Sequence, residues 1–73
     1  MTKNDPSSTA KRLGAEIREV RKARGLTLND LSDQLSCSTA YLSRIELGSA
    51  RISGALLQEI GKALHVDPEW FAP

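Results

Sequence analysis

This chain of 73 residues has little cysteine, proline or aromatic side chain, and these scarcities limit what it can be. Its one cysteine, Cys37, cannot close an internal disulfide, which argues against a disulfide-stabilised secreted domain. Its three prolines lie near the two ends, so they interrupt no helix in between. No apolar run approaches the length of a membrane span, and the N-terminus lacks the apolar stretch of a signal peptide. We therefore expect a soluble cytoplasmic protein that does not contact a membrane.

The length and the charge limit the architecture further. Seventy-three residues allow one domain, whose small core would gain from a dimer partner. The net charge is only +1, but residues 1–24 carry seven Lys or Arg and three Asp or Glu, a net charge of +4. Residues 25–48 carry −2 and residues 49–73 carry −1. The basic first segment is either an ordinary solvated surface or part of a surface for an anionic partner.

The pattern along the chain predicts an all-α fold with five short helices, because no segment alternates apolar and polar residues with a period of two. Residues 1–8 are polar and are expected to form a flexible N-terminal arm, with residues 9–73 as the domain. A residue that can cap a helix precedes each predicted helix. The prediction is a first helix from a Thr9 cap to Arg24, a second over 28–35 capped by Thr27, a third over 39–47 capped by Ser38, a fourth capped by Ser53 and ending at Leu64, and a final turn after Asp67.

The helices carry apolar stripes at helical spacing, which identify the expected core. Gly25 and Gly48 fit the position that ends a helix. The expected core residues are Leu13, Ile17, Val20, Leu28, Leu31, Leu35, Cys37, Leu42, Ile45, Leu56, Leu57, Ile60 and Leu64.

The helices predicted over 28–35 and 39–47 are joined by a turn of only three residues, which forces a steep crossing rather than an antiparallel hairpin. This is the geometry of a helix-turn-helix motif, whose second helix protrudes. Short side chains on the outward side would let this helix approach base edges in the major groove of duplex DNA, and an arginine there can reach a guanine. The predicted base contacts are Thr39, Ala40, Ser43 and Arg44.

Further polar residues near this motif are candidates for phosphate contacts, although each can also be an ordinary surface or packing residue. Lys11 and Arg12 lie near the start of the first helix, and Arg51 lies in the loop after the third. Ser38 and Tyr41 lie at the beginning of the third helix. The predicted phosphate contacts are therefore Lys11, Arg12, Ser38, Tyr41 and Arg51.

Residues 38–48 read STAYLSRIELG, close to the pattern S-x-x-y-L-S-x-I-E-x-G. With this string, the chain resembles the lambda-repressor/Cro-like family of helix-turn-helix domains from about Leu13 to Phe71. The resemblance implies a dimer that binds an operator with its third helix in the major groove. The other matching residues are Ile17, Arg18, Arg21, Gly25, Leu26, Thr27, Leu31, Leu57, Ile60, Ala63, Leu64 and Val66.

Several positions differ from the residue that is usual in this family. Where the family has a Gln that often contacts a phosphate, this chain has Leu28, which we expect to offer its backbone N–H instead. Ser36 replaces the usual turn Gly and would be strained in a left-handed conformation. The remaining departures are Ser32 for Ala, Ile52 for Pro and Gly61 for Ala.

The resemblance also implies an ion pair between Arg21 and Glu46 that would link the first helix to the third. Trp70 and Phe71 are two large aromatic residues near the end of a chain that buries little surface. Such residues either complete the core or make a patch for a partner. We predict them as the dimer interface, with one of the two also serving the core.

The sequence contains no set of nucleophile, base and orienting residue, and His65 has no second ligand at metal spacing. We therefore expect no enzyme, no metal and no cofactor. The prediction is a sequence-specific DNA-binding transcriptional regulator, most simply a repressor. The alternative is a protein-interaction module with the same fold, such as an antitoxin or adaptor that docks a toxin or co-regulator. A phage repressor, a restriction–modification controller and an antitoxin all fit this sequence.

Overall fold

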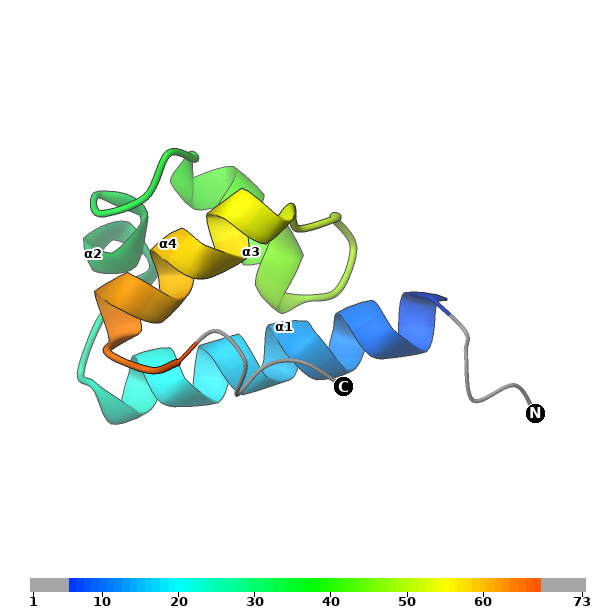
Figure 1. Ribbon diagram of the computed structural model, residues 1–73, viewed down its shortest axis with the longest axis horizontal. Coiled ribbons are helices and arrows are strands. Elements are labelled where there is room, and N and C mark those ends of the chain that lie inside the picture. Colours follow the sequence, from blue (N-terminus) through cyan, green and yellow to red (C-terminus); the bar gives the residue numbers. More distant parts are fainter. Residues whose placement is uncertain (1–5, 68–73) are drawn as a thin grey trace.

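The computed structural model describes residues 6–67, and over these residues its secondary structure is helical. The elements are α1 (Pro6–Ala23), α2 (Leu28–Ser32), α3 (Thr39–Glu46) and α4 (Gly54–Leu64). Figure 1 shows α1 along the long axis of the molecule, with α2, α3 and α4 on one side of it. The predicted all-α fold is confirmed. The described residues contain four helices, and the fifth, predicted after Asp67, lies outside them.

Three of the predicted helix caps are confirmed. Thr27, Ser38 and Ser53 have extended backbone conformations, and each side-chain oxygen accepts a hydrogen bond from the backbone N–H three residues on. At α2 the Asp30 carboxylate also accepts from the Thr27 N–H at 2.9 Å, which completes a capping box. These contacts satisfy N–H groups that have no partner within the helix.

The predicted start of the first helix was wrong. The helix α1 begins at Pro6, so Thr9 lies within it and does not cap it. Proline is favoured in the first turn because its missing N–H would have no helical partner there. Of the arm expected over residues 1–8, Pro6–Ser8 belong to α1, and residues 1–5 lie outside the described part of the chain.

The predicted end of the second helix at Leu35 was also wrong, because α2 ends at Ser32. The chain tightens after this residue: the Gln34 N–H donates to Leu31 O and the Leu35 N–H donates to Ser32 O, each a bond over three residues. The connection to α3 is therefore residues 33–38 rather than a three-residue turn. The backbone N–H of Ser36 donates to the Glu59 carboxylate at 2.8 Å, which fastens this connection to α4.

Three helices end in the same hydrogen-bonded motif, in which a residue with positive φ follows the helix. Gly25 after α1 and Gly48 after α3 have φ of 74° and 79°, as their predicted role requires. After α4 the position is taken by His65, with φ of 60°. Ser36 does not adopt the left-handed conformation that would strain it. Among the described non-glycine residues, His65 is the one with positive φ.

The core is formed by one stripe from each helix, as the apolar spacing predicts. Partly buried apolar residues pack against this core, among them Leu13, Val20, Leu28, Leu35, Cys37 and Leu57. Every helix of the described residues is too short or too polar to cross a membrane. The buried apolar residues of the described chain are Ile17, Leu31, Leu42, Ile45, Leu56, Ile60 and Leu64.

Two glycines allow α1 to lie directly against the C-terminal end of α3. A Cβ on Gly14 would fall 2.7 Å from the carbonyl oxygen of Glu46 and still closer to that of Ile45. A Cβ on Gly48 would fall 2.6 Å from the Cα of Lys11. Real Cβ atoms are not found at these distances from backbone, so both positions require glycine. This close packing fixes the orientation of α3 on α1.

Candidate nucleic-acid interface

One side of α3 is buried and the other faces outward. The outward stripe consists of Ala40, Ser43, Arg44 and Leu47, at spacings of three, four and seven residues. Ala40 and Arg44 are exposed, Ser43 is half-buried, and Leu47, the residue that caps the C-terminal end of α3, is 68% exposed. The inward residues are Leu42, Ile45 and Glu46. The helix therefore presents small side chains and one arginine outward, while its inward residues pack against the rest of the protein.

Thr39 is placed differently from the other three predicted base contacts. Its side chain is half-buried and forms hydrogen bonds with two residues of α2, Asn29 and Ser32. The hydroxyl of Ser38, next to it, accepts from the Tyr41 N–H at 3.0 Å. The first turn of α3 is thus held by its own cap and by α2.

Tyr41 and Arg51, two predicted phosphate contacts, are brought together. The Tyr41 hydroxyl donates to the Arg51 carbonyl oxygen, so the tyrosine holds the α3–α4 loop, while the Arg51 side chain is exposed. The proton of the Tyr41 hydroxyl is therefore already used within the protein. A phosphate offers only acceptors, so in this arrangement Arg51 rather than Tyr41 has the free donors of this pair.

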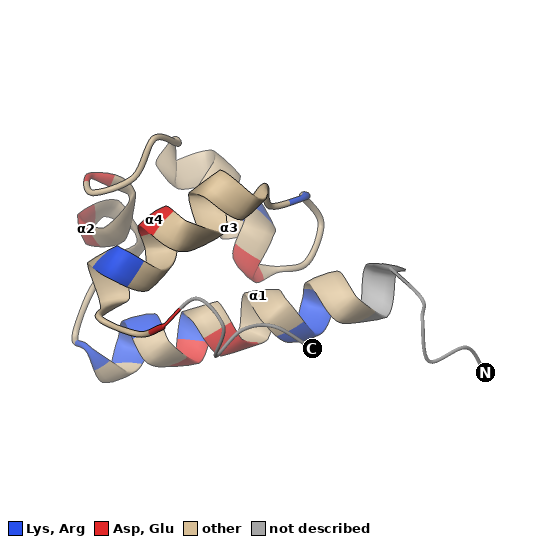
Figure 2. Cartoon of the chain, viewed as in Figure 1, with Lys and Arg blue, Asp and Glu red and all other residues tan. Residues whose placement is uncertain are grey.

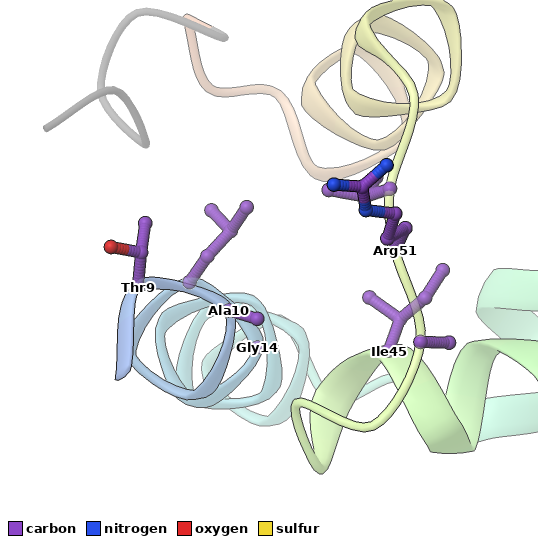
Figure 3. A pocket seen from close by; sticks show the side chains of 8 residues that line it. Thr9, Ala10, Gly14, Ile45 and Arg51 are labelled. Atoms are coloured by element: carbon purple, nitrogen blue, oxygen red, sulfur yellow. The ribbon is translucent and has the colours of Figure 1, made fainter. Parts of the chain in front are cut away.

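A pocket of about 440 Å³ lies between the first turns of α1 and the α3–α4 loop. In Figure 3, Thr9, Ala10 and Gly14 line its α1 side, with Ile45 and Arg51 opposite. The walls formed by the described residues 6–67 are mostly aliphatic, and they contain no carboxylate, imidazole or thiol that could act as an acid or base. Leu13, Ala50 and Ile52 also line it.

The predicted phosphate contacts of α1 lie on its exposed surface. Lys11 and Arg12 are both exposed, and the guanidinium of Arg12 lies 3.7 Å from the Glu16 carboxylate one turn further on. In Figure 2, α1 carries several Lys and Arg with acidic residues among them and the α3–α4 loop carries a basic residue, whereas α2 carries an acidic one. The N-terminal half of α1 and the α3–α4 loop thus form a basic border near the C-terminal end of α3, where Gly48 touches Lys11.

At the start of α2, Leu28 is half-buried and packs against the core. Its side chain thus serves the fold, and its proposed contact would use its backbone. In the neighbouring capping box, hydrogen bonds with the backbone and side chain of Thr27 favour the charged carboxylate and lower the pKa of Asp30. The Asp30 carboxylate therefore stays ionised at neutral pH.

Arg21 and Glu46 lie against each other between α1 and α3, both buried. The Arg21 guanidinium donates to both Glu46 carboxylate oxygens, at 2.8 and 3.1 Å, and also to the Leu26 carbonyl oxygen at 2.7 Å. This pair fastens the C-terminal end of α3 to α1.

The described residues contain no group of three or more His, Cys, Asp or Glu placed to hold a metal ion. Burial, followed by the charge of nearby Glu59, raises the pKa of the Cys37 thiol, so the neutral thiol is favoured over the reactive thiolate. Trp70 and Phe71, predicted as a dimer interface, lie outside the described residues.

Sequence reasoning missed three residues near this surface. Leu47 was not predicted as a contact, although its spacing of seven from Ala40 places it on the same stripe. Asn29 and Ser32 were not predicted because nothing in their local pattern indicates that they reach across to Thr39. A contact between two helices cannot be read from the periodicity of either one.

The family model described as helix-turn-helix matches residues 17–71 of this chain. The chain belongs to the helix-turn-helix family. Among curated proteins, it is 32% identical over 60 residues to the uncharacterised HTH-type transcriptional regulator YazB of Bacillus subtilis, covering 82% of this chain and 87% of that protein. It is 27% identical over 70 residues to the uncharacterised HTH-type transcriptional regulator y4wC of Sinorhizobium fredii. That match covers 96% of this chain but only 49% of y4wC, so the chain spans about half the length of this relative.

The fold is also similar to that of a protein solved in complex with DNA. The structure of Bacillus thuringiensis PlcR in complex with the peptide PapR7 and DNA superposes with a TM-score of 0.79 at 39% identity. The match covers 85% of this chain and 22% of the PlcR chain. With the family match, these similarities confirm the predicted class: a DNA-binding transcription-regulator domain, not an enzyme.

Proposed function

We propose that this protein regulates transcription as a homodimer that occupies an operator, most simply as a repressor, with α3 in the major groove. The observation that carries this proposal is the outward stripe of α3. Ala40 and Ser43 are short enough for the helix backbone to approach base edges, and Arg44 can form a bidentate contact with guanine O6 and N7. Leu47, on the same stripe, can contact a thymine methyl group.

The remaining contacts in the proposal position the domain on the DNA backbone. Lys11, Arg12 and Arg51 would each neutralise a phosphate, and for Arg12 this means exchanging its Glu16 partner. Leu28 would offer its backbone N–H, and Ser38 the hydroxyl proton that its cap bond leaves available. Tyr41 would act through the loop that it holds.

A dimer is proposed because one domain of this size offers only one recognition helix and little buried surface. Trp70 and Phe71 remain the proposed interface. Two protomers related by a two-fold axis would read half-sites whose centres lie about one helical turn, roughly 34 Å, apart. A protein that acts at an operator would lie in the same compartment as the chromosome, and we expect that compartment to be the cytoplasm.

Selection of bound duplexes from a random pool tests this proposal. The expected result is a palindromic motif with half-sites one helical turn apart, which gives both the activity and the dimeric state. A motif with a single half-site that is fully protected by one protomer would contradict the dimer. Failure to enrich any duplex would contradict DNA recognition and favour the alternative, a module that docks a protein such as a toxin or co-regulator.

A further inference from the structure

Three polar side chains form a closed group where α2 meets α3. The Ser32 hydroxyl lies 3.1 Å from the backbone oxygen of Asn29 and 2.7 Å from the Thr39 hydroxyl. The Thr39 hydroxyl in turn lies 3.1 Å from the side-chain oxygen of Asn29. Ser32 is only 6% exposed, whereas Asn29 is exposed and Thr39 lies between them in exposure. The group therefore extends from the protein interior to the first residue of α3.

The number of protons in this group determines what Thr39 can still do. A hydroxyl donates one hydrogen bond, and a carbonyl oxygen donates none. If Thr39 donates its proton to the Asn29 side-chain oxygen and Ser32 donates its proton to the Asn29 backbone oxygen, the 2.7 Å contact between the two hydroxyls has no proton. If the Asn29 amide presents its NH₂ group instead, the Thr39 proton goes to Ser32, and all three contacts are satisfied. In both arrangements the Thr39 proton is used within the protein.

We propose that Asn29 and Ser32 are positioning residues that determine specificity: they hold the Thr39 hydroxyl so that it presents only a lone pair to DNA. This inference rests on the proposed function, in which the first turn of α3 faces the major groove. An oxygen that only accepts will pair with an exocyclic amino group, which in the major groove is N6 of adenine or N4 of cytosine. It will not pair with an acceptor such as purine N7.

The first step of the test locates the base pair that Thr39 faces. Duplexes are selected with the wild-type protein and with Thr39→Val, which keeps the branched shape but lacks the hydroxyl. Thr39 reads the base pair at the position where the preference of Thr39→Val differs from that of the wild-type protein. Nucleoside analogues are then placed at this position in the wild-type duplex.

The expected result depends on which group is deleted. Replacing adenine by deoxynebularine, or cytosine by the pyrimidin-2-one nucleoside, removes only the exocyclic amino group. This should weaken wild-type binding by about two- to tenfold, the value of one hydrogen bond, and leave Thr39→Val unaffected. A 7-deazapurine, which lacks the N7 acceptor, should bind the wild-type protein unchanged. A loss with the 7-deazapurine and none with the amino deletion would overturn the inference.

The second step tests Asn29 and Ser32 directly. In the double variant Asn29→Ala/Ser32→Ala the Thr39 proton is free, so the hydroxyl can donate as well as accept. The ratio of affinities for the selected base pair and the same pair reversed should fall by about two- to tenfold. Ser49→Ala is the matched control, because Ser49 also donates to a backbone oxygen, that of Arg44, but lies outside this group. That variant should keep the wild-type ratio.

A purely structural role for Asn29 and Ser32 would give a different result. The double variant would then bind both duplexes more weakly by the same factor, and its thermal midpoint would fall in parallel, which would overturn the inference. If the wild-type protein selects no duplex, the proposed function itself is wrong, and this inference falls with it. The two failures are therefore distinguishable.

Discussion

Arg21 and Glu46 are 25 residues apart in the sequence, yet they form a bidentate ion pair that joins α1 to the C-terminal end of α3. Their side chains are only 10% and 4% exposed. A carboxylate at this end of a helix opposes the helix dipole, and the arginine compensates for it. The same guanidinium also donates to the carbonyl oxygen of Leu26, in the connection between α1 and α2. The pair therefore orients the helix that is proposed to read DNA.

Glu46→Gln should destabilise the fold by about 3–5 kcal/mol, because it leaves a buried guanidinium without its counter-charge. The effect should lie toward the lower end, since the Leu26 oxygen still accepts from Arg21. Chemical denaturation of Glu46→Gln, Arg21→Met and the double variant gives a double-mutant cycle. The double variant should lose clearly less than the two single losses together, and simple additivity would show that the two residues are not coupled.

Gly14→Ala should destabilise the protein by roughly 1–3 kcal/mol, because the new Cβ would press on the backbone of Ile45 and Glu46. Gly54→Ala is the matched control, since a Cβ there meets nothing within 4 Å. That variant should be neutral or more stable by about 0.4–1 kcal/mol, through the unfolded chain. Equal effects of the two substitutions on the urea midpoint would contradict the close packing of α1 on α3.

His65→Gly should stabilise the protein by about 1 kcal/mol, because residues with a side chain are strained in the left-handed backbone conformation of His65 and glycine is not. Asn tolerates this conformation better than most residues, so His65→Asn should fall between the wild type and His65→Gly. Urea denaturation gives the order. A less stable His65→Gly would mean that the imidazole contributes more than the backbone strain costs.

Much of this fold follows from short-range patterns in the sequence. The caps Thr27, Ser38 and Ser53 and the glycines that end α1 and α3 were predictable because each acts on its own helix. The start of α1 was predicted wrongly because Thr9 has a side chain that can cap a helix, whereas the helix begins earlier, at Pro6, a residue type that the first turn favours. The early end of α2 was missed because Leu35 keeps the helical spacing of four from Leu31, while the backbone hydrogen bonds donated by Gln34 and Leu35 span three residues instead of four.

The candidate site was less predictable, since its parts meet only in three dimensions. The stripe of Ala40, Ser43 and Arg44 follows from periodicity within α3. The link from Thr39 to Ser32 and Asn29 does not, because it joins two helices through side chains of no distinctive pattern. The requirement for glycine at position 14 is likewise set by the backbone of α3, which passes close to it.

Arg44→Ala should weaken binding to the preferred duplex by about 1–3 kcal/mol and relax selectivity at one base pair. The reason is that Arg44 is exposed on the outward stripe of α3 and can reach a base edge. Competition binding with duplexes altered one base pair at a time measures this. The matched control is Arg18→Ala, an exposed arginine of α1, which should leave selectivity unchanged. An equal loss of affinity for all duplexes would show that Arg44 contacts a phosphate instead.

The most direct test of the central claim, that α3 reads duplex DNA while basic residues around it hold the phosphates, is the salt dependence of binding to a selected duplex. The logarithm of the binding constant should fall linearly with the logarithm of the salt concentration, with a slope of about −0.9 for each phosphate neutralised. Arg51→Ala should reduce the magnitude of this slope by about one per protomer and weaken selected and unrelated duplexes alike. Binding that does not change with salt, or that does not distinguish the selected duplex from an unrelated one, would contradict the account.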